Sequence, residues 1–310
     1  MLKKMRAVAV LAVIALFVLA VAGCGDSPAT SETSAVTTAD QGSNASTEGN
    51  APDSSSGPKV ELKFAFFTSD NTCPGETALW WIDEIQKRTN GQVRVKWFPG
   101  GSLLTAKNTF TGVLQGVADV GLACAPYEPG RFPLISINDL PGLYVTGKEA
   151  SLSVTDVILA NKEKMTELKD FYIVGAFGMD PGRLMTIKKY ETLESLKSVE
   201  LRTPGGPQTL QALGITEVAM PQSEIAQALQ TGVLDGIYTS RDLLLDGKYA
   251  EKTKHMIEYP LGSITFLAVM TQAKYESLPA NVQQVIDDLV IPFAEKGGDG
   301  VCDDRAACDY

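Results

Sequence analysis

The residue best suited to bind a small molecule is Arg202, in the stretch Glu200–Pro207. An arginine that ends a strand before a Pro-Gly-Gly turn is held on a rigid element and points beyond the strand, where open α/β sheets bind ligands. Its planar guanidinium presents paired N–H donors that match the two oxygens of a carboxylate. Arg202 therefore predicts a carboxylate-binding site, and the alternative is an arginine on the surface or in an ion pair.

The chain offers little for catalysis. Its single histidine, His255, lies beside Met256 and Ile257 in a segment that reads as a strand, where a structural or exposed role is favoured. A nucleophile elbow, a phosphate-binding loop, a dinucleotide fingerprint and a paired metal-ligand motif are all missing from the sequence. We therefore expect a protein that binds a ligand without a cofactor or a metal ion, and not an enzyme.

The first 23 residues have the pattern of an export signal. Three positive charges precede an uncharged apolar run from Ala7 to Gly23. That run is shorter than the roughly 20 apolar residues of a membrane-spanning helix. The small residues before Cys24 resemble the lipobox of bacterial lipoproteins. We predict a lipoprotein signal peptide at residues 1–23 and lipidation of Cys24, which would hold the exported protein on the membrane in an extracytoplasmic location. A plain signal peptide is the alternative.

Residues 24–58 have the composition of a disordered linker. After Cys24 they contain no aromatic residue and no Leu, Ile, Lys or Arg. Such a segment cannot bury enough apolar surface to offset the entropy of ordering it, so we expect a flexible tether. The whole chain carries a net charge of −10, and loss of the positive signal peptide makes it more acidic. Nucleic acid and anionic lipid surfaces are therefore poor partners for the folded part.

From residue 59 onward, strand patterns alternate with helix patterns. This alternation favours largely parallel sheets with helices packed on their faces, and it restarts after residue 180. We expect an α/β protein of two lobes, with lobe I at residues 59–180 completed by about 265–310. Lobe II would span 181–264, with a contribution from the C-terminal helix. The expected strands are 60–67, 93–97, 119–124, 171–177, a segment around 201, 217–220 and 264–270, and the expected helices are 75–89, 105–117, 149–168, 208–213, 223–230 and 281–296.

Two segments of the chain resemble each other, residues 114–121 and residues 229–236, with one residue inserted in the second. In each, a helix is expected to end near a glycine, and an aspartate stands where the next strand begins. Glycine permits the left-handed turn at a helix end, and aspartate can accept hydrogen bonds from nearby backbone amides. A true repeat and a coincidence between two ordinary helix-to-strand joints both remain open at this length.

Several short motifs occur in an order and spacing that is specific when they are taken together. They are Val60–Ala65, Arg88–Val93, Phe98–Gly101, Gly116–Asp119, Leu201–Pro204, Met220–Pro221 and Ala228–Gly236. With these motifs the chain resembles the TRAP-type solute-binding proteins of the dicarboxylate-binding family, over roughly residues 60–295. The resemblance implies a periplasmic-binding-protein-like fold, with two lobes of mixed sheets flanked by helices and a hinge between them. It also implies a receptor that captures a small organic acid, such as a C4-dicarboxylate, and delivers it to a TRAP-type membrane permease driven by an ion gradient.

The resemblance assigns roles to two arginines. Arg202 falls on the family's ligand-clamping arginine, and Arg183 falls near a second arginine that often assists it. Two arginines on one cleft wall would hold a carboxylate through charge-assisted hydrogen bonds, and closure of the lobes would remove competing water. Arg131 is a further candidate for an anion contact, with a surface arginine as the favoured alternative.

The sequence departs from the family after Asp235. Where many relatives read Gly-Gln-Glu-Asn-Pro, this chain has Gly236-Ile237-Tyr238-Thr239-Ser240. The usual amide contact is therefore missing or replaced. The hydroxyl groups of Tyr238, Thr239 or Ser240 are the candidates to replace it, and an ordinary loop packed by Tyr238 is equally open.

Export makes disulfides permissible in this chain. Cys73 follows the first expected strand and Cys124 ends the third, so we expect both at the cleft-facing ends of neighbouring strands and predict a bridge between them. Cys302 and Cys308 lie in an acidic tail without the ligand spacing of a calcium loop, and we read it as a frayed terminus. The chain also ends sooner than its relatives, and truncation is one reading of that.

Two other binding functions share the expected fold. One is the binding protein of an ABC-type uptake system for amino acids or other solutes, which would need a carboxylate for the ligand's ammonium group as well as an arginine. The other is a receptor that presents its ligand to a sensor kinase. Three aromatic residues, Trp80, Trp81 and Tyr127, either line the cleft or fill the core, and the core is favoured for the tryptophan pair.

Overall fold

The structure is a computed structural model, and it describes residues 59–205 and 208–299. The predicted signal peptide at residues 1–23, the predicted lipidation site Cys24, the linker up to residue 58 and the tail with Cys302 and Cys308 lie outside the described residues. Among the described helices, none combines the length and the apolar character that crossing a membrane requires.

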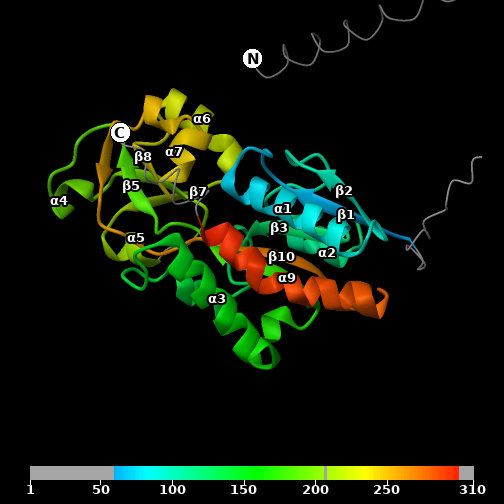
Figure 1. Cartoon of the computed structure of the whole chain (residues 1–310). Coiled ribbons are helices and arrows are strands. Elements are labelled where there is room, and N and C mark those ends of the chain that lie inside the picture. Colours follow the sequence, from blue (N-terminus) through cyan, green and yellow to red (C-terminus); the bar gives the residue numbers. More distant parts are fainter. Residues whose placement is uncertain (1–58, 206–207, 300–310) are drawn as a thin grey trace, which may run out of the picture. The chain divides into compact units, whose positions relative to one another are not determined.

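The first lobe is built on a five-stranded sheet with the order β2-β1-β3-β10-β4 (Figure 1). β1 pairs with β2 and β3 in parallel, whereas β10 runs antiparallel to both of its neighbours, β3 and β4. The sheet is therefore mixed, although the alternation of strands and helices favoured parallel pairing. The strands are β1 (Val60–Phe66), β2 (Val93–Phe98), β3 (Val120–Cys124), β4 (Phe171–Gly178) and β10 (Thr265–Thr271).

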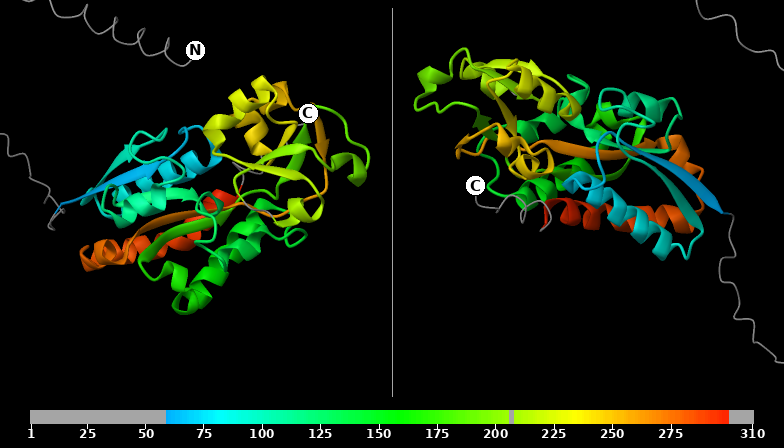
Figure 2. Two further views of the ribbon diagram at one scale, coloured as in Figure 1. Left: turned by 180° about the vertical axis from the view of Figure 1, so that it is seen from behind. Right: turned by 90° about the horizontal axis from the view of Figure 1, so that it is seen from above.

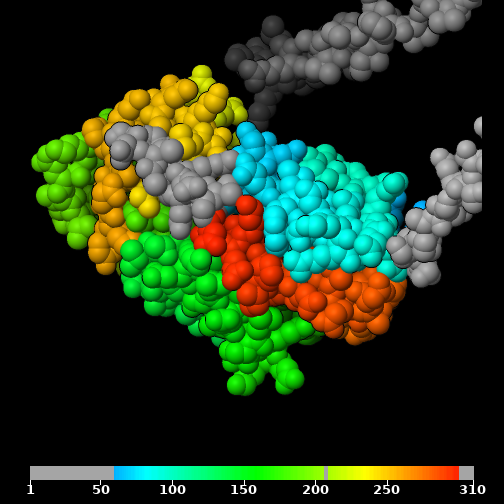
Figure 3. Space-filling view, in the orientation of Figure 1, coloured from blue at the N-terminus to red at the C-terminus, as the bar shows by residue number. Residues whose placement is uncertain are grey.

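Helices cover both faces of this sheet, and a single apolar core joins them to it. Fully buried aromatic residues such as Phe64, Trp81 and Phe177 fill that core. Figure 3 shows α9, in red, between the cyan surface of α1 and the green surface of α3, and α9 also packs on β4. The C-terminal helix thus belongs to the first lobe. The helices are α1 (Cys73–Arg88), α2 (Thr109–Leu114), α3 (Gly147–Asn161), α8 (Gln272–Glu276) and α9 (Ala280–Gly298), with short 3-10 turns η2 (Ala125–Tyr127), η3 (Ile135–Asp139), η4 (Lys162–Lys164) and η5 (Thr166–Leu168).

The second lobe repeats the sheet of the first. Its order is β7-β6-β8-β5-β9, with β6 parallel to β7 and β8, and β5 antiparallel to β8 and β9. The strands are β5 (Arg183–Thr186), β6 (Glu200–Thr203), β7 (Thr216–Ala219), β8 (Gly236–Thr239) and β9 (His255–Ile257). The helices are α4 (Leu193–Leu196), α5 (Gln208–Ala212), α6 (Gln222–Thr231) and α7 (Asp242–Asp246), with a 3-10 turn η6 (Tyr249–Glu251).

The sequence echo corresponds to the same joint in both lobes. Gly116 and Gly232 both have left-handed backbones, with φ of 74° and 72°. Asp119 Oδ2 accepts from the backbone N–H of Lys63 at 2.7 Å, and Asp235 Oδ2 accepts from that of Glu200 at 3.0 Å. Each aspartate thus fastens the start of one strand to the parallel strand beside it. The joint places β6, which carries Arg202, at the position that β1 holds in the first lobe.

The chain crosses between the lobes twice, at residues 179–182 and 258–264. The two crossing segments hydrogen-bond to each other, from Met179 N to the carbonyl of Ile264 at 3.0 Å and from Gly182 N to that of Gly262 at 3.0 Å. As a result β10 returns to the first sheet next to β4, where Figure 2 shows them in orange and green. The two crossings give the lobes a narrow, paired connection.

The predicted bridge between Cys73 and Cys124 is not formed. Cys124 is a free, buried thiol, whereas Cys73 is disulfide-bonded. The reason lies in where the two side chains sit. Cys73 begins α1, and its Sγ lies 4.0 Å from the carbonyl oxygen of Gly297 in α9, while Cys124 lines the pocket at the end of β3.

Candidate functional site

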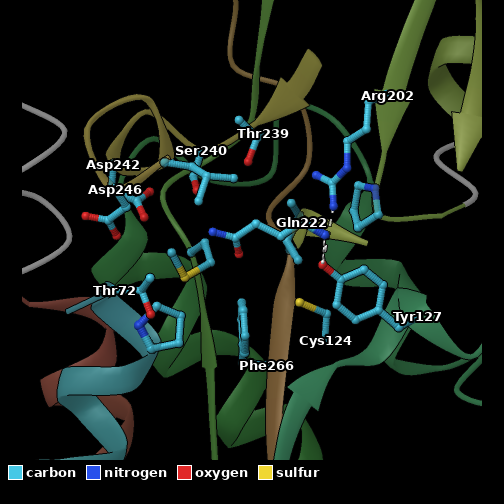
Figure 4. A pocket seen from close by; sticks show the side chains of 15 residues that line it. Thr72, Cys124, Tyr127, Arg202, Gln222, Thr239, Ser240, Asp242, Asp246 and Phe266 are labelled. Carbon is cyan, nitrogen blue, oxygen red and sulfur yellow. Dashed lines mark hydrogen bonds between the residues drawn. The ribbon is translucent and has the colours of Figure 1, made fainter. Parts of the chain in front are cut away.

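A pocket at the ends of β3, β6 and β8 collects side chains from both lobes (Figure 4). Its free volume is about 30 Å³, far below the roughly 300 to 1,000 Å³ of pockets that hold a small-molecule ligand. An acid of several carbon atoms therefore fits only when the lining side chains move apart. The lining residues are Thr72, Pro74, Cys124, Tyr127, Met179, Arg202, Pro204, Gln222, Thr239, Ser240, Asp242, Leu243, Asp246, Ile264 and Phe266.

Arg202 lies in this pocket, where only 2% of its surface is exposed. It stands near the end of β6, between β7 and β8, and the burial of that strand carries the guanidinium into the interior. Its Nε donates to the carbonyl of Met220 at 3.0 Å, and its Nη2 donates to the hydroxyl of Tyr127 at 3.3 Å. Among the described residues, no carboxylate lies within 4.0 Å of it. Within the described part of the chain, this buried cation has no counterion.

The groups beside Arg202 are neutral. Burial raises the pKa of the Tyr127 hydroxyl and that of the Cys124 thiol far above their usual values, although the positive charge of Arg202 opposes both shifts. The Tyr127 oxygen accepts from Arg202 and also from the backbone N–H of Gln222, at 3.3 Å each. Neither Tyr127 nor Cys124 therefore supplies the missing negative charge.

Carboxylates lie on the other side of the pocket from Arg202 (Figure 4). They follow β8 on the short helix α7, where Asp242 and Asp246 both line the cavity. Burial raises the pKa of Asp242 to about 7, and its Oδ1 is buried without a hydrogen-bond partner among the described residues. Asp246 Oδ2 accepts from the backbone N–H of Cys73 in the first lobe at 3.3 Å. Between the two sides lie Thr239 and Ser240, the last residue of β8 and the one after it.

Arg183 and Tyr238, which the sequence analysis also placed at the site, do not line the pocket. Arg183 is directly opposite Thr239 across the antiparallel pair β5–β8, so both side chains emerge on one face of the sheet. Its Nη1 donates to the carbonyl of Pro181, its Nε is buried without a partner among the described residues, and burial lowers its pKa. Tyr238 points to the opposite face, where its hydroxyl donates to the carbonyl of Gly262 at 2.6 Å. Tyr238 therefore packs the core of the second lobe.

Arg131 lies away from the pocket, in the first lobe. Its Nη1 lies 2.5 Å from Glu128 Oε2, and its guanidinium carbon lies 5.4 Å from the centre of the Phe171 ring. Since its charge is already balanced and it does not line the pocket, we leave it out of the site. Of the predicted site residues, the structure brings Arg202 and Thr239 into the pocket, together with Ser240 and Tyr127, which the sequence left open.

Gln222 and Asp242 are pocket residues that sequence reasoning missed. Gln222 begins α6, directly after the Met220–Pro221 motif, and its side chain extends into the pocket in Figure 4. Asp242 resembles any acidic residue in the first turn of a helix. The position of α7 next to the altered stretch at 236–240 was the one signal that could have pointed to it.

The geometry agrees with what comparison to known proteins finds. The model of the bacterial extracellular solute-binding protein family 7, DctP, matches residues 64–298. The chain belongs to this family. The resemblance to TRAP solute-binding proteins and the two-lobed fold with mixed sheets are confirmed, and the family is one of solute-binding receptors rather than enzymes.

Three similar proteins illustrate the match. A solute-binding protein of Albidiferax ferrireducens is 24% identical over 210 residues, which cover 66% of this chain and 62% of that protein, so the chain spans less than two thirds of that relative. A TRAP periplasmic solute-binding protein of Desulfovibrio salexigens is 35% identical with a TM-score of 0.69, over 80% of this chain and 77% of that one. Its ligand-binding site holds the C-terminus of a symmetry mate. A TRAP protein from a marine metagenome, specific for aromatic acids and bound to 3-hydroxybenzoate, is 27% identical with a TM-score of 0.75, over 81% of each chain.

Proposed function

We propose that this protein is a TRAP receptor that captures a small organic acid through Arg202. The observation that carries the proposal is the buried guanidinium with no carboxylate within 4.0 Å among the described residues. Taking a charge out of water costs several kcal/mol unless a partner compensates it. A ligand carboxylate is the partner that the remaining N–H donors of the guanidinium fit.

The relatives support an acid as the ligand. The metagenome protein binds an aromatic acid, and the Desulfovibrio protein holds a chain terminus, which ends in a carboxylate. In this chain the hydroxyl of Tyr127 comes from the first lobe and contacts Arg202 in the second. A carboxylate bound to Arg202 would therefore meet both lobes, and binding would favour their closure about the crossings at 179–182 and 258–264.

Delivery and location complete the proposal. The closed receptor would hand its acid to the membrane subunits of a TRAP permease. Lipidation at Cys24 would keep it at the outer face of the membrane, with the linker as a tether. Arg183 would add positive charge beside the site without lining the pocket.

The experiment is mass spectrometry of small molecules released when the purified protein is denatured, with Arg202→Ala purified in parallel. Arg131→Ala is the matched control, because Arg131 is an ion-paired arginine outside the pocket. We expect an organic acid from the unmodified protein and from Arg131→Ala, and none from Arg202→Ala. Release of the same acid from Arg202→Ala, or release of a neutral or cationic molecule from all three, contradicts the proposal.

A further inference from the structure

The side of the pocket opposite to Arg202 carries a buried carboxyl group whose Oδ1 the described residues leave unsatisfied. Asp242 is 1% exposed, and its Oδ1 has no hydrogen-bond partner in the described part of the chain. No lysine or arginine of the described residues forms an ion pair with it. The neighbouring Asp180 shows the contrast, since Arg241 Nε lies 3.1 Å from its carboxylate. Among the described residues, Asp180 is thus paired with a cation, whereas Asp242, which lines the pocket, is not.

We propose that the pocket binds acids that carry a hydrogen-bond donor, an ammonium or a hydroxyl group, at the end opposite to their carboxylate. Asp242 Oδ1 accepts from that donor, while Arg202 binds the carboxylate. This inference rests on the proposed role of Arg202 and adds the chemistry of the ligand's far end. It predicts that the ligand is not a dicarboxylate, although the family resemblance suggested one.

The charge of the group at the far end of the ligand determines which of these acids binds best. A second carboxylate on the ligand would lie against Asp242, and like charges in a buried site repel strongly. An ammonium group would compensate the charge of Asp242, and a hydroxyl group would satisfy its Oδ1 without a net charge. A methyl group would leave Oδ1 unsatisfied. The order of affinity should therefore be ammonium or hydroxyl first, then methyl, then carboxylate.

A purely structural role for Asp242 is the competing explanation. It is the first residue of α7, which has only five residues, and its carboxylate could simply face a helix start. In that case, substitution of Asp242 would change the stability of the protein and leave the ranking of ligands unchanged. The ranking is therefore the readout that separates the two roles.

The test uses acids that differ only at the far end. Butyrate, 4-hydroxybutyrate, 4-aminobutyrate and succinate form one set, and the corresponding six-carbon acids form a longer one. Titration calorimetry on the full-length protein measures affinity, and thermal unfolding measures ligand-dependent stabilisation. In at least one set, we expect the hydroxy-substituted or amino-substituted acid to bind about tenfold more tightly than the acids that end in a methyl or a second carboxylate group. A tenfold difference corresponds to about 1.4 kcal/mol.

Asp242→Asn keeps the size of the side chain and removes its charge. This substitution should lower the affinity for the tightest-binding amino-substituted acid by about tenfold or more. It should also reduce the preference for that acid over the dicarboxylate of the same chain length. Three results overturn the inference: a dicarboxylate that binds best, four equal affinities within each set, or no binding by any donor-bearing acid. If Arg202→Ala abolishes binding while Asp242→Asn leaves the ranking unchanged, the proposed function stands and this inference fails. Acids that bind equally well to Arg202→Ala would instead contradict the proposed function.

Discussion

Replacing Asp242 by asparagine should stabilise the ligand-free protein, and more strongly as the pH rises. Burial raises the pKa of this carboxyl from 3.8 to about 7 in the folded state; a hydrogen bond with Ser240 opposes the shift, and the neighbouring charges of Asp246 and Asp180 add to it. The folded state therefore holds the proton more tightly than the unfolded chain does. The stability that this proton contributes is fully present below pH 3.8 and is lost as the pH rises through 7.

The size of the expected change in stability follows from the shift in the pKa of Asp242. About three pKa units at 1.36 kcal/mol each mean that ionised Asp242 costs on the order of 4 kcal/mol of folding free energy near pH 8. Near pH 5 the folded carboxyl is protonated and the unfolded one is already ionised, which leaves a cost of about 2 kcal/mol. Asparagine does not titrate. The advantage of Asp242→Asn should therefore grow by about 2 to 3 kcal/mol between these two pH values.

Urea unfolding followed by tryptophan fluorescence measures this difference at both pH values. Asp139 also has a pKa raised to about 7 by burial, but it is present in both proteins, so its effect cancels in the comparison. A stability difference that stays constant or shrinks as the pH rises would show that Asp242 is not a buried, uncompensated carboxyl. The account of the pocket's acidic side would then be refuted.

Three further outcomes are expected. Tyr127→Phe keeps the ring and removes the hydroxyl that contacts Arg202, so calorimetry should show about fivefold weaker acid binding, the worth of about 1 kcal/mol; unchanged affinity would exclude Tyr127 from the site. Arg183→Ala should weaken binding less than Arg202→Ala, because Arg183 does not line the pocket, and an equal or larger loss would reverse their ranking. Native protein should resist alkylation at Cys124 and react once unfolded, because burial raises the pKa of this thiol and the thiolate is the reactive form; rapid labelling of native protein at Cys124 contradicts this.

Much of the first lobe was readable in the sequence, because its strands are long and apolar. The expected strand at 171–177 appears as β4, and the expected helix at 281–296 appears as α9. The helix expected at 105–117 is shorter, since α2 begins only at Thr109. The side chain of Asn108 accepts from the backbone N–H of Thr105 at 2.6 Å, and such local bonds compete with the first turn of a helix.

The central strands of the second lobe were harder to predict from the sequence. Strands β5 and β8 have four residues each, too few to show a period. A strand was expected to begin near Asp235, but hydroxyl contacts and an ordinary loop both stayed open for Tyr238 and Thr239, which lie in β8. Its place between β6 and β5 decides that Thr239 faces the pocket and Tyr238 the core. The sequence could name Arg202 through its motif, but the burial of Asp242 depends on contacts between distant segments. No local pattern contains that information.

We propose that the buried guanidinium of Arg202 holds the ligand's carboxylate. To test this, the acid released from the purified protein is titrated by calorimetry into the unmodified protein and into the Arg202→Lys, Arg202→Ala and Arg131→Ala variants. We predict a loss of about 2 to 5 kcal/mol in binding free energy for Arg202→Ala, a smaller loss for Arg202→Lys, which keeps the charge without the planar fork, and none for Arg131→Ala. Undiminished affinity in a correctly folded Arg202→Ala protein would contradict the claim.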